Sequence, residues 1–388
     1  MHKSSHRPAI KKDDGTRQWQ KRIWRKTGHF VPLALVLVVI SVMLGSCYPA
    51  YGNQTTSNCT PNAILVNPCR PWFGAAASGN PGAPRDQTSQ ANYLEKLAGH
   101  PLDIFRFYHN PSGGGSNGDL PLNGAEIYFA KRSNTYIQVN WKPASTWAAA
   151  GGGDATINAQ IKQAADNIKA VAPHKIFLTI WHEPENDVSA FDNSAEQTAC
   201  QNAPNFKGLK GNAGTPDQYK AMWQNVENIF KQEGATNVVW AMNYMSYPPF
   251  YCLVPQLWPG NQYVDWVLYD TYGHSKDYAN TAGAFYKVLQ QDSSPSVDLN
   301  SKPWGLGEFN DCTPKNPQGA ITYFNDAEAA FKANTYPRLK MYLIYADTGN
   351  NAGPGCLTNY NANGQPYPAK QAAFNQLANA VLNSSSGP

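Results

Sequence analysis

The sequence predicts an α/β protein folded as a (β/α)8 TIM barrel, with long loops at the carboxyl face of its strands. From about residue 72 onward, short apolar runs alternate with helical patterns, and eight such runs can be distinguished. No G-x-G-x-x-G sequence or phosphate-binding loop follows any of these runs, so an open nucleotide-binding sheet has no support. Long Gly-rich or aromatic-rich segments follow several runs, at 110–118, 146–154, 187–214 and 348–367.

The clearest strand is K-I-F-L-T-I-W-H-E-P-E-N, residues 175–186. Its apolar run is typical of a strand buried on both faces, as in a parallel sheet, and Pro184 ends it because proline cannot continue a hydrogen-bonded ladder. The eight expected strands are Trp72–Ser78, Asp103–His109, Thr135–Trp141, Lys175–Glu183, Asn237–Asn243, Asp265–Tyr272, Lys302–Phe309 and Lys340–Asp347.

Helical patterns lie between most of these strands. The best defined begins after Thr215, where Pro216 suits the first turn and Gln218 completes a capping box, and it ends at Gly234. Between the fifth and sixth strands, residues 244–264 indicate mostly loop. The expected helices are Ala91–Ala98, Ala125–Arg132, Ala155–Val171, Pro216–Gln232, Ala282–Gln291, Ala320–Ala333 and Ala369–Leu382.

The amino-terminal part has a different character. Residues 1–29 are basic and expected to stay cytoplasmic, and residues 30–47 contain a 15-residue apolar core typical of an export signal or anchor. Leu44-Gly45-Ser46-Cys47 resembles a lipobox, and an uncleaved anchor is the alternative. Residues 48–70 are expected as a polar linker and 71–388 as the catalytic barrel. We therefore expect an exported monomer held at the membrane through its amino-terminal segment.

Charge and cysteine content agree with export. Residues 1–46 hold nine Lys/Arg and two Asp, so the rest of the chain has 22 bases and 25 acids, which does not suggest a nucleic-acid surface. Six cysteines follow Cys47, an even set that indicates three disulfides, with six free thiols as the alternative. Cys59 and Cys69 are near in sequence, and loops after neighbouring strands lie together in a barrel, so we predict the pairs Cys59–Cys69, Cys200–Cys252 and Cys312–Cys356.

Two glutamates carry the predicted chemistry. Glu183 and Glu308 each end a short apolar strand, and the carboxyl ends of barrel strands are where such enzymes hold their active sites. A pair of carboxyl groups, one acting as proton donor and one as nucleophile or base, is what glycoside hydrolysis requires. The alternative is that both are ordinary solvated acids. H-E-P-E is not a zinc-binding helix motif, because the second histidine is missing and Pro184 interrupts it.

Other strand ends present polar or aromatic side chains that are candidates for binding substrate or supporting the two glutamates. An arginine or tyrosine beside a nucleophilic glutamate would keep it ionised, whereas the acid partner needs a raised pKa. Aromatic side chains in these positions stack on sugars or simply pack in the core. The candidates are Arg106, Trp141, Lys142, Tyr244, Asp270, Tyr272 and Tyr345, with His109, His274 and Asp347 as weaker ones and Trp72, Trp181, Tyr247 and Phe250 as further possible sugar-stacking rings.

Over residues 72–384 the chain resembles clan A glycoside hydrolases, and most of all glycoside hydrolase family 26. The resemblance is carried by His182 directly before the first glutamate, by Asp270-Thr271-Tyr272, and by T-P-D-Q-Y-K-A-M-W-Q-N-V followed by N-V-V-W. It implies Glu183 as acid/base, Glu308 as nucleophile, Tyr272 hydrogen-bonded to Glu308, His182 lining the site and Arg106 near the nucleophile. It implies no cofactor and no metal.

The family consists mainly of endo-β-mannanases, so the resemblance implies a retaining endo-β-glycanase that acts on β-1,4-mannan-type polysaccharide. A β-glucanase or xylanase with the same two glutamates is the alternative within enzymes, and a catalytically idle carbohydrate-binding barrel is the alternative outside them. Two departures stand out: P-E-N-D-V-S-A-F follows the first glutamate where mannanases of the family usually carry glycine and aromatics, and Tyr345 replaces the usual tryptophan.

The expected geometry follows from these roles. Retaining enzymes hold their two carboxyl groups about 5–5.5 Å apart, and we expect that spacing between Glu183 and Glu308. Strand alternation would point His182 away from Glu183, so both reach the site only if the strand end twists or bulges. If the substrate is mannan, aromatics after the fourth and fifth strands should form the floor of the cleft.

Overall fold

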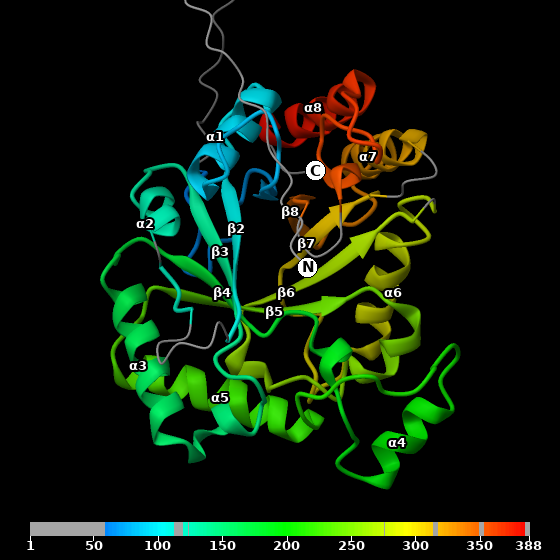
Figure 1. Ribbon diagram of the computed structural model, residues 1–388. Helices are drawn as coiled ribbons and strands as arrows, with labels where there is room; N and C mark the ends of the chain where they lie inside the picture. The colour runs from blue at the N-terminus through cyan, green and yellow to red at the C-terminus, as the bar shows by residue number, and fades with distance from the viewer. Residues whose placement is uncertain are drawn as a thin grey trace, which may run out of the picture. The chain divides into compact units, whose positions relative to one another are not determined.

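Eight parallel strands close into a barrel in chain order, each paired with its sequence neighbours and β1 paired with β8. This confirms the predicted fold class. Figure 1 shows the strands surrounded by helices. The strands are β1 (Trp72–Ala77), β2 (Ile104–His109), β3 (Tyr136–Trp141), β4 (Ile176–Ile180), β5 (Val238–Met245), β6 (Trp266–Tyr272), β7 (Trp304–Asn310) and β8 (Leu339–Ala346).

The computed structural model describes residues 59–111, 119–122, 124–274, 276–312, 317–348 and 353–384. The basic region at 1–29, the signal or anchor at 30–47 with Cys47, and linker residues 48–58 lie outside these ranges. Within them, no helix is both long enough and apolar enough to cross a membrane.

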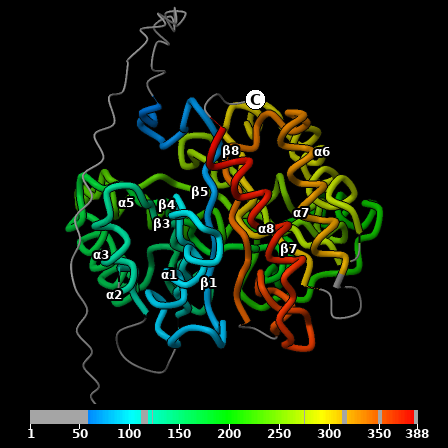
Figure 2. Tube along the Cα trace, turned by 90° about the horizontal axis from the view of Figure 1, so that it is seen from above, coloured from blue at the N-terminus to red at the C-terminus, as the bar shows by residue number. Residues whose placement is uncertain are grey.

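The helices follow the predicted pattern with one addition. A short helix, α4, lies in the segment after β4 that was expected as loop; Asn193 caps it by accepting from the Glu196 amide. Between β5 and β6 the structure has two 3-10 turns, as the loop-like sequence suggested. Figure 2 shows α1 beside α8, which also contact each other. The α-helices are α1 (Gln87–Ala98), α2 (Gly124–Ala130), α3 (Ala155–Lys169), α4 (Ser194–Gln201), α5 (Pro216–Gln232), α6 (Ala282–Asp292), α7 (Pro317–Lys332) and α8 (Pro368–Leu382), and the short turns are η1 (Ala149–Gly153), η2 (Pro184–Asp187), η3 (Pro248–Leu253), η4 (Asn261–Tyr263) and η5 (Pro354–Cys356).

The alternation of side chains along each strand decides what reaches the site. On β2, Ile104 belongs to the core inside the barrel, and Arg106 and Tyr108 follow on the same face at intervals of two. Phe105 and Phe107 point the other way and pack in the layer between barrel and helices. The same rule places polar residues above apolar ones inside the barrel on β5, β6 and β8. On these strands an apolar residue inside the barrel is followed by a polar or tyrosine side chain nearer the carboxyl end.

The segment before β1 covers the amino end of the barrel. Leu65 is buried in the interior core, and its carbonyl accepts from the indole of Trp72 at the start of β1. The indole of Trp266, at the start of β6, donates to the Ile64 carbonyl. In the described part of the segment expected as a linker over 48–70, Ile64 and Val66 also pack against this core.

All three predicted disulfides are present: Cys59–Cys69, Cys200–Cys252 and Cys312–Cys356. The second joins α4 to η3 and so links the segments after β4 and β5. The third joins the segments after β7 and β8, beside the main cavity. Each such link is worth about 2–4 kcal/mol of stability, mainly because it restricts the unfolded chain.

Candidate active site

A cavity of about 640 Å³ opens at the carboxyl ends of the strands, where the fold predicts the site. Glu183 and Glu308 both line it, together with side chains from β2, β6 and β8. Its lining residues are Ala77, Ser78, Gln87, Ala91, Phe105, Arg106, Phe107, Tyr108, His182, Glu183, Met245, Tyr272, His274, Glu308, Cys312, Tyr345, Asp347 and Cys356.

Glu308, on β7, is surrounded by donors. The Tyr108 hydroxyl donates to Glu308 Oε1 at 2.6 Å, and Arg106 Nη2 lies 3.2 Å from the same oxygen. The Tyr272 hydroxyl donates to Oε2, as predicted for this pair. Both oxygens of Glu308 therefore receive donors and one faces a guanidinium, which holds the carboxyl group in a fixed position for nucleophilic attack.

Arg106 is held below Glu308 by two buried side chains, Asp270 and Asn243. Asp270 Oδ1 lies 3.2 Å from Arg106 Nη1, and the side-chain oxygen of Asn243 accepts from the same nitrogen at 3.1 Å. Burial raises the pKa of Asp270 to about 8, and the Glu308 carboxylate adds to this increase while Arg106 opposes it. Asp270 therefore positions the guanidinium under the cavity floor.

Gly307 makes this arrangement possible. A Cβ at position 307 would collide with Asn243, Arg106 and Asp270, which all crowd against the backbone directly before Glu308. Only glycine lets the buried guanidinium come this close to the strand that carries the nucleophile. In the sequence this feature is visible as the glycine directly before Glu308 in G-L-G-E.

Glu183 reaches the cavity through an irregular strand end. Trp181 and Glu183 both have positive φ, 59° and 51°, in the left-handed region that non-glycine residues rarely adopt. The Glu183 amide still donates to the Asn243 carbonyl at 2.9 Å, which fixes the strand end to β5. This confirms the expected departure from regular alternation, and it is the reason why both His182 and Glu183 line the cavity.

Glu183 lies in an environment opposite to that of Glu308. Burial raises its pKa well above the ordinary range for glutamate, and the neighbouring acidic groups of Asp270, Glu308 and Glu185 raise it further, against a lowering by Arg106. The side-chain amide of Asn186 donates to Glu183 Oε2 at 3.2 Å. Glu183 is therefore suited to hold a proton at a pH where an ordinary glutamate would have lost it.

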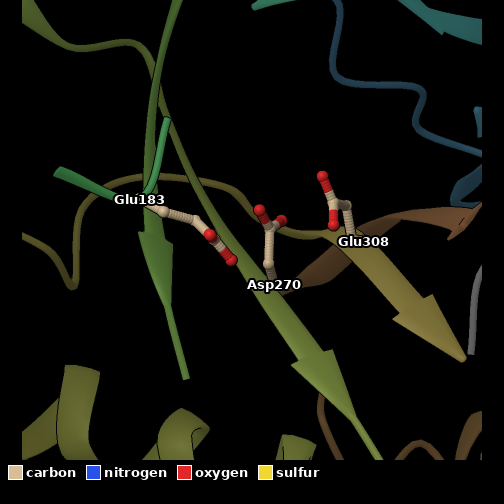
Figure 3. A group of neighbouring side chains, drawn as sticks. All are labelled: Glu183, Asp270 and Glu308. Atoms are coloured by element: carbon tan, nitrogen blue, oxygen red, sulfur yellow. The ribbon is translucent and has the colours of Figure 1, made fainter. Parts of the chain in front are cut away.

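The two glutamates and Asp270 converge on one point. Each contributes a carboxylate oxygen, and these three oxygens lie within 4.8 Å of one another. Figure 3 shows the three side chains, with Asp270 between the other two; Glu183 comes from the segment after β4, Asp270 from β6 and Glu308 from β7. Three carboxylates at this spacing are also a donor set for a cation, but Arg106 already supplies positive charge to Asp270 and Glu308. The arrangement therefore favours proton transfer and nucleophilic attack.

His182 faces Tyr108 edge-on, with ring centroids 5.4 Å apart. Burial lowers its pKa well below the ordinary value for histidine, and the positive charges of Arg106 and Lys142 lower it further. It therefore presents a neutral imidazole to the cavity, able to hydrogen-bond a sugar hydroxyl. Tyr345 also lines the cavity, as the sequence predicted.

Three predicted substrate-binding residues are not at the cavity. Trp141 is 2% exposed and packs against Phe230 of α5, and Tyr244 is fully buried with its hydroxyl on the Val254 carbonyl. Both predictions are wrong because the neighbouring Asn140 and Asn243 occupy the inner face of β3 and β5, which sends the aromatic rings toward the helices. Lys142 lies outside the cavity and pairs with Asp187 at 3.0 Å.

The weaker candidates divide in the same way. His274 and Asp347 line the cavity, and Ser78 Oγ donates to the Asp347 carboxylate. His109 is turned outward and contacts Glu126 at 2.7 Å and Asp119 at 3.0 Å. Trp72 lies at the amino end of the barrel, and Trp181 is covered by Lys142.

Tyr108 contacts Glu308 directly, although no role for it was predicted from the sequence. It follows Arg106 by two positions on β2, so strand alternation places it on the same face and one step closer to the cavity. That spacing was the available signal. Its direct bond to Glu308 makes it a partner of the nucleophile equal to Tyr272.

Comparisons with known proteins concern the family and the fold of this chain. The family model for glycosyl hydrolase family 26 matches residues 149–340. The YdhT protein from Bacillus subtilis matches with a TM-score of 0.53 and 15% identity, covering 84% of this chain and 88% of its own. Bacillus subtilis mannanase BCman has a TM-score of 0.53 and 14% identity, covering 82% and 86%. Bacillus subtilis mannanase man26 has a TM-score of 0.51 and 15% identity, covering 78% and 90%. These structural matches show the shared fold. No curated protein matches the chain by sequence.

Proposed function

We propose that this chain, a glycoside hydrolase whose residues 149–340 match the model for glycosyl hydrolase family 26, is an exported, retaining endo-β-glycanase acting on β-1,4-mannan-type polysaccharide. The observation that carries the proposal is the pair of glutamates in opposite environments. Both oxygens of Glu308 are held by donors, and burial favours the protonated form of Glu183. Their carboxylate oxygens are within 4.8 Å.

The first step uses Glu308 as the nucleophile and protonated Glu183 as the acid. Glu308 attacks the anomeric carbon of the sugar, forming a covalent ester, while the bond from that carbon to the leaving oxygen breaks. Glu183 gives its proton to that oxygen, so the departing chain leaves as a neutral alcohol. Arg106, Tyr108 and Tyr272 hold Glu308 in place before attack, because all three contact its carboxylate.

The second step reverses the roles. Glu183, now ionised, takes a proton from a water molecule, and the oxygen of that water attacks the anomeric carbon. The ester bond breaks and Glu308 returns as a carboxylate. The 4.8 Å limit between the carboxylate oxygens supports this two-step route, because an inverting enzyme keeps its carboxyl groups about 6.5–9.5 Å apart to hold a water molecule between them.

The choice of mannan rests on the resemblance to family 26, in which endo-β-mannanases predominate. One observation favours the glucan or xylan alternative. The cavity takes its tyrosines from β2, β6 and β8 (Tyr108, Tyr272 and Tyr345), whereas the aromatics expected after β4 and β5 to form a mannan-binding floor are not among the lining residues. The proposal of export is supported by the three disulfides, which are typical of proteins outside the cytosol.

A polysaccharide panel tests the substrate. We expect the purified chain to release oligosaccharides from mannan or glucomannan faster than from mixed-linkage glucan or xylan, measured by reducing ends and chromatography of the products. A ladder of intermediate lengths is expected from endo action. Release from glucan or xylan alone would replace mannan by the alternative substrates, and no release from any polymer would favour a carbohydrate-binding protein without activity.

A further inference from the structure

Glu185 is a buried acid two residues after Glu183 with no role in the mechanism above. It is 1% exposed, in the short turn η2 that directly follows the acid/base. Its Oε1 accepts from the Met245 amide at the end of β5, at 3.0 Å, and its Oε2 has no hydrogen-bond partner. Burying an acid with one unpartnered oxygen lowers the stability of the folded protein, so its presence calls for an explanation.

The surroundings of Glu185 keep it uncharged. The titratable groups that influence it or are influenced by it are Glu183 in the same chain segment, Tyr219 on α5, Tyr244 on β5 and Asp270 on β6, and none of these is a cation at neutral pH. No ion pair in the described ranges includes Glu185. Burial raises its pKa well above the ordinary value, although backbone amides of Glu185 and Met245 donate to it.

The turn that carries Glu183 is tied to β5 at Glu183 itself, whose amide donates to the Asn243 carbonyl at 2.9 Å, and again two residues later, where Glu185 accepts from the Met245 amide. Regular pairing of β4 with β5 ends at Leu178 and Trp240, several residues before the catalytic position. Beyond it the chain takes the left-handed conformation at Glu183, and the far end of η2 is held by Lys142 and the Trp181 indole, both bonded to Asp187. On the β5 side, Glu185 reaches Met245, which itself lines the cavity.

We propose that Glu185 is a positioning residue for the acid/base: it fixes the turn that carries Glu183 to the end of β5. It does this as a neutral carboxylic acid, so it anchors the turn without placing a negative charge beside Glu183, which must itself become an anion when it gives up its proton. The inference rests on the proposed role of Glu183. Glu185 does not touch the substrate, but it determines where Glu183 delivers its proton.

The test depends on the leaving group. In this proposal Glu185 affects the reaction only through the position of Glu183. Glu183 is needed mainly when the leaving oxygen must be protonated. A polysaccharide has a poor leaving group, whereas a 2,4-dinitrophenyl β-glycoside of an oligosaccharide of the same sugar has one that departs without protonation. Comparing kcat/KM on the two substrates, which reports the first chemical step, therefore separates a misplaced acid from general damage.

Three variants and a control carry the experiment. Glu185→Leu removes the acceptor, Glu185→Asp is too short to reach Met245 without moving the turn, and Glu185→Gln keeps a neutral acceptor of the same length. The control is Glu227→Leu, since Glu227 on α5 is also 2% exposed with an unpartnered Oε2 but belongs to the outer layer. Thermal unfolding of all four shows which variants remain folded.

We expect Leu and Asp at position 185 to lower kcat/KM on polysaccharide by about 10- to 100-fold, the cost of moving a catalytic group by roughly 1 Å. On the dinitrophenyl substrate the loss should stay below about threefold. Glu185→Gln should remain within about threefold of wild type on both substrates, with the alkaline limb of its pH profile unmoved. Glu227→Leu should lower the unfolding temperature without changing the ratio between the substrates.

Several results would overturn the proposal. Equal losses of kcat/KM on both substrates in Glu185→Asp would show that Glu185 has only a structural role. Unchanged kcat/KM in both Glu185→Leu and Glu185→Asp would show that Glu185 does not position Glu183. If Glu185→Leu does not fold, the Asp and Gln variants still decide. A downward shift of the alkaline limb in Glu185→Gln would show that Glu185 is an anion. The proposed function fails separately, when the wild type hydrolyses neither polysaccharide nor aryl glycoside.

Discussion

Replacing Glu308 by alanine should abolish turnover, with kcat lowered by at least about 10⁴-fold on every substrate, because loss of a covalent nucleophile removes the reaction path itself. The donors that hold Glu308 remain in the variant, so the effect comes from the missing carboxylate and not from a collapsed site. Stopped and steady-state assays on polysaccharide and on a dinitrophenyl β-glycoside measure the loss.

A control and a rescue make this result specific. Glu328 on α7 is 5% exposed and paired with Lys332 outside the barrel, so Glu328→Ala should keep its activity while losing some stability. Adding azide or formate to Glu308→Ala should restore turnover of the aryl glycoside, because a small anion fits where the carboxylate stood. The azide product should have the opposite anomeric configuration. Activity of Glu308→Ala above about 1% of wild type would exclude Glu308 as the nucleophile.

Replacing Glu183 by alanine should give a loss that depends on the leaving group. On polysaccharide, kcat/KM should fall by about 10²- to 10⁴-fold, the usual contribution of a general acid. On the dinitrophenyl glycoside it should fall less than about tenfold, because that leaving group needs no proton. Azide should then accelerate the second step, since it attacks the covalent intermediate without a base.

The pH dependence should change in a defined direction. Glu183 must be protonated in the first step, so wild-type kcat/KM falls as the pH rises through its pKa, which burial and neighbouring carboxylates place well above the ordinary glutamate value. In Glu183→Ala this alkaline limb should disappear with the aryl substrate. A limb that persists unchanged would assign the acid to another group, and equal losses on both substrates would remove Glu183 as acid/base.

Much of this structure was predictable because all parallel strands of a barrel end at the same face, which determines both the fold and the place of the site. Eight apolar runs ending in polar residues predicted the barrel, and both glutamates sit at strand ends as expected. The pairing of cysteines followed from the same topology, since loops after adjacent strands meet. These predictions needed only the order of strands and the side of the sheet on which they end.

The errors came from the direction of individual side chains. Trp141 and Tyr244 are at strand ends but on the outer face, and counting by two from Asn140 and Asn243 would have excluded them. The same count from Arg106 would have found Tyr108. Glu183 could not be placed by counting, because positive φ at Trp181 and Glu183 breaks the alternation. Tertiary contacts alone determine that turn, which is why Glu185 had no visible role in the sequence.

The central claim is double displacement at Glu308 with Glu183 as acid/base, and the stereochemistry of the first product tests it most directly. Proton NMR recorded during the first minutes of hydrolysis, before mutarotation, should show the β-anomer of the new reducing end. Each displacement inverts the anomeric carbon, and two of them restore its configuration. The α-anomer as initial product would contradict the account, because it requires a single displacement by water in a site whose carboxylate oxygens lie within 4.8 Å.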